Sequence, residues 1–154
     1  MTRAGAIPVK FVLNGRECEI EVAPFDLLID VLRDRLDLKG TKRSCDVEVC
    51  GACTVLRDGM PISSCTTLAA DIDETSVLTI EGVSDAQLSA VQQAFVDHGA
   101  LQCGFCTPGM VLAVTSLLNE DPHPSDQKIR HYLRGNICRC TGYVKILDAV
   151  KSLA

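Results

Sequence analysis

The sequence predicts an α+β protein in which a small sheet precedes a bundle of helices. Alternating strand patterns and two hairpin turns lie in the first half of its 154 residues, and helical patterns lie in the second half. Eight of the nine cysteines also divide between the halves, four in each. We therefore expect two compact units, residues 1–82 and residues 83–154, joined by a linker near residues 81–85.

The first half begins with a predicted hairpin. Residues 9–13 alternate and lead into Asn-Gly at positions 14–15, a dipeptide typical of two-residue hairpin turns. In the next strand, Cys18, Ile20 and Val22 share one face, while glutamates occupy the other. Cys18 is therefore expected to be a small core residue rather than a reactive thiol.

A helix, a second hairpin and a last strand follow. Apolar spacing predicts the helix over residues 26–36, and Asp-Gly at positions 58–59 separates the strands 54–56 and 61–63. The last strand is expected at residues 77–80. The order of hairpin, helix, hairpin and strand is compatible with a β-grasp fold.

The second half predicts four short helices. Ser84 and Gln87 form a capping box for the first helix, and Gly99 is its expected stop. Pro108 occupies the favoured first position of the second helix, and Thr141 is expected to cap the fourth. The predicted helices span residues 84–98, 107–118, 125–135 and 143–153.

Both cysteine sets have spacings that a metal cluster explains. The first set begins with the C-x4-C-x2-C run of plant-type [2Fe–2S] ferredoxins, and the second pairs C-x2-C with C-x-C. The expected ligands are Cys45, Cys50, Cys53 and Cys65 in the first set, and Cys103, Cys106, Cys138 and Cys140 in the second. Two such clusters predict a protein that transfers single electrons.

The residues around the ligands suit an anionic cluster. Gly51 and Ala52 are small, so backbone amides are expected to approach the sulfur atoms closely. Helices that begin just after Cys106 and Cys140 would direct their partially positive N-termini at the second cluster. Arg139 adds a positive charge between two ligands.

Three other uses of these cysteines fit the sequence less well. A disulfide framework is disfavoured because no export signal is recognisable and such short loops bridge poorly. Structural zinc remains a remote alternative, since zinc sites usually pair two C-x2-C units. A Rieske centre needs two histidine ligands, and His98, His123 and His131 do not have that spacing.

Composition limits the partners. The formal net charge is −5 and no basic run is present, so nucleic acid is an unexpected partner. No window is long and apolar enough for a membrane span or a secretory signal, so we expect a cytoplasmic protein.

Three segments carry a family resemblance. They are CDVEVCGACTV at 45–55, QCGFCTPG at 102–109 and NICRCTGY at 136–143. In this order they resemble the iron–sulfur subunit of molybdenum hydroxylases, the family of xanthine dehydrogenase, aldehyde oxidoreductase and carbon monoxide dehydrogenase. The resemblance spans nearly the whole chain.

The resemblance implies a plant-type ferredoxin domain followed by a four-helix bundle, each with one [2Fe–2S] cluster. It implies a large partner subunit with molybdenum and molybdopterin cytosine dinucleotide, and a medium subunit with FAD, in a heterotrimer or a dimer of heterotrimers. Electrons would pass from the molybdopterin site through the bundle cluster and the ferredoxin-type cluster to FAD. Delivery to a cytochrome or another carrier is the alternative. This chain would relay electrons and hold no catalytic residue.

The resemblance also assigns two residues and marks one departure. Gln102 and Cys140 are expected to contact the pterin, although from the residues alone Gln102 is an ordinary loop or helix-cap amide. Glu48 stands where relatives commonly have glycine or serine. If this position requires a positive φ, Glu48 is strained, and its carboxylate would lower the potential of the nearby cluster.

Overall fold

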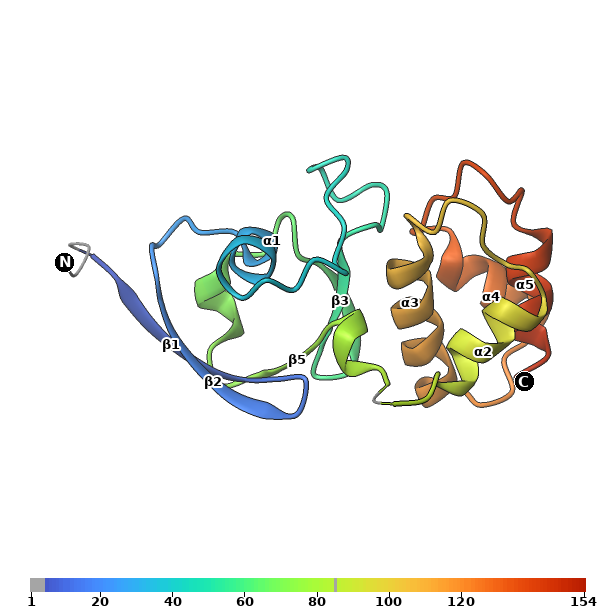
Figure 1. The fold of residues 1–154 in the computed structure, drawn as a ribbon, viewed down its shortest axis with the longest axis horizontal. Coiled ribbons are helices and arrows are strands. Elements are labelled where there is room, and N and C mark those ends of the chain that lie inside the picture. The colour runs from blue at the N-terminus through green and yellow to red at the C-terminus, as the bar shows by residue number, and fades with distance from the viewer. Residues whose placement is uncertain (1–4, 85) are drawn as a thin grey trace.

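The computed structural model describes residues 5–84 and 86–154, so Met1–Ala4 and Asp85 of the predicted linker lie outside the described residues. Figure 1 shows strands toward the N-terminal end, helices toward the C-terminal end, and α3 between them.

The predicted first hairpin is confirmed. Strand β1 (Ile7–Leu13) pairs antiparallel with β2 (Arg16–Val22), and Phe11 lies opposite Cys18. Asn14 and Gly15 have φ values of 51° and 79°, the left-handed conformation that this turn requires. Cys18 is half-buried and packs against the hydrophobic core formed by the sheet and the helical segment that covers it, as expected.

Within the described residues the sheet has five strands in the order β2-β1-β5-β3-β4. The second hairpin is confirmed as β3 (Thr54–Arg57) and β4 (Met60–Ser63), and β5 (Ser76–Leu78) runs parallel to β1 and antiparallel to β3. The last strand ends at Leu78, two residues earlier than predicted. The backbone N–H of Thr79 instead donates to Asn14 Oδ1 at 2.8 Å, and a 3₁₀ turn, η3 (Ile80–Gly82), follows.

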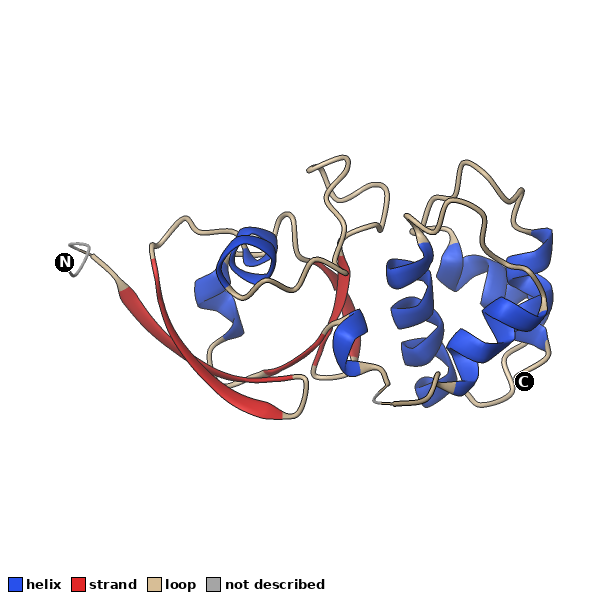
Figure 2. Ribbon diagram, in the orientation of Figure 1, coloured by secondary structure: helices blue, strands red, loops and turns tan. Residues whose placement is uncertain are grey.

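One helical segment packs on the sheet. It consists of α1 (Leu28–Asp30) and a π-helical turn, η1 (Val31–Arg35), so it is slightly shorter than the predicted 26–36. Leu28, Val31 and Leu32 of this segment join the buried residues of the strands and of the 3₁₀ turn η2 (Ala69–Ile72) in one core. Figure 2 shows this segment beside the sheet, away from the helices of the second half.

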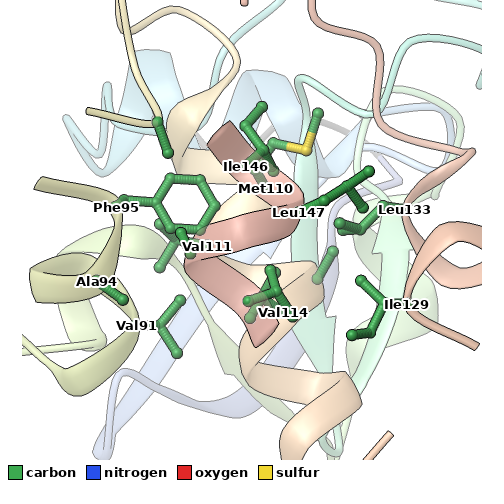
Figure 3. Packing of buried hydrophobic residues seen from close by; sticks show 14 of the residues in the cluster. Val91, Ala94, Phe95, Met110, Val111, Val114, Ile129, Leu133, Ile146 and Leu147 are labelled. Atoms are coloured by element: carbon green, nitrogen blue, oxygen red, sulfur yellow. The ribbon is translucent and has the colours of Figure 1, made fainter. Parts of the chain in front are cut away.

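Helices α2 (Ala90–Asp97), α3 (Thr107–Glu120), α4 (Asp126–Leu133) and α5 (Val144–Lys151) form the second half. They share a second core, in which Phe95 packs among residues of α3 and α5 (Figure 3). Helix α3 is buried along most of its length because it also contacts β3 and β4 of the sheet. This helix therefore joins the two halves.

Two predicted helix caps are wrong. The N-cap of helix α2 lies five residues later than expected, and its capping box is Ser89 with Gln92 rather than Ser84 with Gln87. Helix α5 has Tyr143 at its N-cap, with a φ of 69°, so Thr141 does not cap it. The predicted cap of α4 is confirmed, since Ser125 Oγ accepts from the backbone N–H of Lys128.

No helix in the described part of the chain, residues 5–84 and 86–154, has the length and apolar character needed to cross a bilayer.

Candidate metal centres

The first cysteine set lies in the loop between η1 and β3 and just after β4. In Figure 1 this loop projects from the molecule beside the N-terminal end of α3. The backbone N–H groups of Val47, Val49 and Cys50 hydrogen-bond to the Cys45 sulfur and lower the pKa of that thiol to about 6. Backbone amides therefore approach a sulfur of this set closely, as the sequence predicts.

The four thiols of this set associate in two pairs. Cys45 interacts with Cys50, and Cys53 interacts with Cys65. The second pair is buried beside Ile29, and burial raises the pKa of the Cys53 thiol to about 11. One pair thus faces the exposed loop while the other faces the protein interior.

The second cysteine set also forms two pairs. Cys103 Sγ and Cys140 Sγ lie 3.6 Å apart and are exposed. Cys106 interacts with Cys138 on the inner side of the same loops. The two short motifs, which lie more than thirty residues apart in the sequence, therefore meet in space as predicted.

The inner pair has a distinct environment. Cys106 is the N-cap of α3, and burial raises the pKa of its thiol to about 12. For Cys138 burial acts in the same direction, but the Thr141 hydroxyl at 3.1 Å and the backbone N–H groups of Thr141 and Cys140 outweigh it and lower the pKa. The N-terminus of α3 borders the site, as expected. Helix α5 begins only at Val144, after Cys140 and its neighbours.

The paired arrangement fits a dinuclear cluster. Two sulfur atoms that share one tetrahedral metal at about 2.3 Å lie roughly 3.8 Å apart, close to the 3.6 Å between Cys103 and Cys140. Within residues 5–84 and 86–154, no three His, Cys, Asp or Glu side chains converge on a point that would suit a single ion. Two thiol pairs per set match the two thiolates that each iron of a [2Fe–2S] cluster takes.

A junction between the halves connects the two cysteine sets. The backbone N–H of Ile137 donates to the backbone carbonyl of Cys50 at 2.8 Å. The buried Asn136 side chain donates to the carbonyl of Gly51 at 3.1 Å and lies 3.3 Å from Thr54 Oγ1. A short stretch before Cys138 is thus bonded to Cys50 and its successor.

Two glycines permit this junction. A Cβ on Gly51 would lie 2.5 Å from Asn136 Nδ2, and a Cβ on Gly109 of α3 would lie 2.2 Å from the Gly51 carbonyl oxygen. Gly51 also has a φ of 68°. The small residue beside the ligands therefore serves the contact between the halves, a role that sequence reasoning missed.

The remaining candidate residues lie on the surface. Gln102 and Arg139 are exposed beside the exposed pair Cys103 and Cys140. Glu48 is exposed and has a φ of 59°, so this position does adopt the left-handed conformation. The expected backbone strain at Glu48 is present.

Sequence reasoning missed three residues that support the second set. They are Asn136, the Thr141 hydroxyl and Tyr143, whose hydroxyl accepts from the backbone N–H of Cys138 at 2.8 Å. Their position around Cys138 and Cys140 was the available signal, since polar residues next to predicted ligands often orient them.

Comparisons with known proteins agree with this geometry. Residues 11–79 match a family described as a 2Fe–2S iron–sulfur cluster binding domain, and residues 79–151 match one described as a [2Fe–2S] binding domain. The nicotinate dehydrogenase small FeS subunit of Eubacterium barkeri is 44% identical over 94% of this chain and 93% of its own length. The xanthine dehydrogenase iron–sulfur-binding subunit of Escherichia coli O157:H7 is 42% identical, over 97% of this chain and 96% of its own.

Solved structures give the same relationship. The crystal structure of quinoline 2-oxidoreductase from Pseudomonas putida 86 contains a chain that is 44% identical, with a TM-score of 0.92 over 96% of this chain and 91% of that one. The paired thiols, the two domain matches and these relatives together identify the chain. It belongs to the family of [2Fe–2S] iron–sulfur small subunits of molybdenum hydroxylases, which are subunits of oxidoreductases.

Proposed function

We propose that this chain relays single electrons from a molybdopterin site in a large partner subunit to FAD in a medium partner subunit. The proposed order is the second cluster first and the first cluster next. The ligands would be Cys103, Cys106, Cys138 and Cys140, followed by Cys45, Cys50, Cys53 and Cys65. A [2Fe–2S] cluster accepts and releases one electron at a time.

The hydrogen bond from the Ile137 N–H to the Cys50 carbonyl carries this proposal. Cys50 belongs to the first set, and Ile137 directly precedes Cys138 of the second. One 2.8 Å hydrogen bond and a few covalent bonds therefore connect ligands of both proposed clusters. A connection this short is what a relay between two centres requires.

The exposure of the two sets supports the proposed order. Cys103 and Cys140 are exposed beside Gln102, so a pterin in a large subunit could contact this surface. Cys45 lies in a separate, projecting loop, which leaves the first cluster open to another partner. We infer that Gln102 and Cys140 contact the pterin, and that the assembly is a heterotrimer or a dimer of heterotrimers.

We further propose the finer architecture. Residues 1–82 would form a β-grasp ferredoxin-type domain and residues 83–154 a four-helix bundle. The parallel pairing of β1 and β5, with α1 packed on the sheet, supports the first assignment. We infer a cytoplasmic location, where cysteines remain reduced for cluster assembly.

The test combines metal analysis with spectroscopy on the purified complex. We expect four irons and four acid-labile sulfides per chain, from two clusters with two irons each, and two distinct paramagnetic signals after reduction. Stoichiometric zinc without iron, or a single signal in fully loaded protein, would contradict the relay.

A cysteine variant tests the order of transfer. Cys103→Ser should reduce turnover from substrate to acceptor to background while the ferredoxin-type signal remains, because the first electron acceptor is lost. Cys18→Ser is the matched control, since Cys18 packs against the sheet core and should leave both signals and turnover unchanged. Turnover that persists in Cys103→Ser would show that the proposed order is wrong.

A further inference from the structure

The loop that carries the first cysteine set contains two carboxylates with different surroundings. Asp46 and Glu48 both adopt the left-handed conformation, with φ values of 57° and 59°. Asp46 forms an ion pair with Arg43 Nε at 3.0 Å, and Arg43 also pairs with Asp30. Within residues 5–84 and 86–154, no basic group lies within ion-pairing distance of Glu48. The negative charge of Glu48 is therefore not offset locally.

A hydrogen-bond contact places this charge beside the proposed ligands. Glu48 Oε2 lies 3.3 Å from Thr66 Oγ1, and Thr66 directly follows Cys65. In the sequence Glu48 stands between Cys45 and Cys50. From within the segment that supplies three of the four thiols, the Glu48 carboxylate thus contacts the residue that follows the fourth, Cys65.

The backbone conformation at position 48 makes glutamate less favourable than glycine for the stability of the folded chain. A left-handed φ crowds the Cβ of any residue other than glycine, so glycine would fit this position without strain. Among the described residues, 5–84 and 86–154, Glu48 has no ion-pair partner that would offset the strain. Its remaining distinctive property is the fixed charge.

We propose that Glu48 is a positioning residue for electron transfer whose carboxylate lowers the reduction potential of the first cluster, an inference that rests on the proposed function. Reduction adds an electron to an already anionic cluster, and a nearby negative charge makes that addition less favourable. A lower potential makes the reduced first cluster a stronger donor to the final acceptor. Glu48 therefore favours the last step of the relay, in which the first cluster passes its electron to the final acceptor.

The test is a redox titration of the assembled protein with both clusters loaded, followed by electron paramagnetic resonance. Glu48→Gln keeps the size of the side chain and the backbone strain but removes the charge. We expect the midpoint potential of the first cluster to rise, with that of the second cluster unchanged. Glu48→Gly should raise the potential in the same direction and also raise the denaturation temperature, because it relieves the strain.

Glu17→Gln is the matched control. It removes one exposed carboxylate from β2, which lies three strands from β3, or about 14 Å at the usual strand spacing. Both potentials should then remain as in the unaltered protein. A shift equal to that of Glu48→Gln would show a general effect of net charge and would overturn the proposal.

Salt provides a second readout that a purely structural effect would not change. The screening length falls from about 30 Å at 0.01 M salt to about 3 Å at 1 M, so the difference between Glu48→Gln and the unaltered protein should shrink as salt rises. A shift seen only in Glu48→Gly would assign the effect to the backbone and overturn the role of the charge. No shift in Glu48→Gln, with two centres titrating, would overturn this inference alone, whereas fewer than two centres in the unaltered protein would overturn the relay.

Discussion

At the residue scale, the candidate ligands have different chemical character although all are cysteines. Cys45 has its thiol pKa lowered to about 6 by three backbone N–H groups, whereas burial raises that of Cys106 to about 12. The spacing in the sequence predicts which cysteines belong together. It does not predict these differences, because they arise from backbone amides and burial that exist only in the folded chain.

Thiol reactivity in the cluster-free protein should reveal this difference. Only the thiolate is alkylated, so the rate at Cys45 should rise with pH and reach half its maximum near pH 6, while Cys106 should react little up to pH 8. Timed iodoacetamide labelling with peptide mass spectrometry measures both rates. Circular dichroism must show that the chain keeps its fold after cluster removal, and half-maximal labelling of Cys45 near pH 9 would contradict the prediction.

At the element scale, strands and hairpins follow the sequence more closely than helix starts do. The segments starting at Ser84 and at Ser89 both read S-x-x-Q, so the spacing alone offers two capping boxes. The structure uses the second, which places Val91, Ala94 and Phe95 in the helical core. Leu88, which precedes the observed cap, is 53% exposed. The helical core begins at Val91, and this packing is not visible in the spacing of the two possible caps.

A pair of serine variants separates the two caps. Ser89→Ala should lower the free energy of unfolding by about 1 kcal/mol, because the backbone N–H of Gln92 loses its acceptor. Ser84→Ala should change it little. Chemical denaturation of the loaded protein measures both values, and equal losses in the two variants would refute this assignment.

The same scale explains why other helix details were unpredictable. Thr141 stands where a cap is expected, yet its hydroxyl hydrogen-bonds to the Cys138 sulfur and accepts from the Tyr143 N–H. The π-helical turn after α1, in which the Leu36 N–H donates to the Val31 carbonyl, leaves no mark in a pattern of apolar spacing. Both features are local hydrogen bonds of the folded chain, and the spacing of apolar residues does not encode them.

At the scale of the whole molecule, polar contacts bind the sheet half to the helical half. Asn136 donates to Gly51, and Ser116 Oγ of α3 donates to the Gly59 carbonyl at 2.7 Å. The composition and the two cysteine sets predict two units, but they do not predict this junction. It depends on residues far apart in the sequence that meet only after each half has folded.

Removing the Asn136 side chain should loosen this junction. Asn136→Ala leaves the buried Thr54 hydroxyl with one hydrogen-bond partner fewer. We therefore expect the free energy of unfolding to fall by about 1–3 kcal/mol. Unfolding followed separately through the iron–sulfur absorbance and through helical circular dichroism should then no longer coincide. Asn119→Ala, at an exposed position of α3, is the control. Coincident transitions with unchanged stability in Asn136→Ala would show that the contact is not important for cooperativity.

The bond between Ile137 and Cys50 is made entirely by main-chain atoms. The side chain at position 137 is 47% exposed and takes no part in it. Apart from proline, which has no N–H to donate, any amino acid at this position preserves the link. The exposed side chain at position 137 can consequently change to suit different partner subunits, while the main-chain hydrogen bond between the two halves is kept.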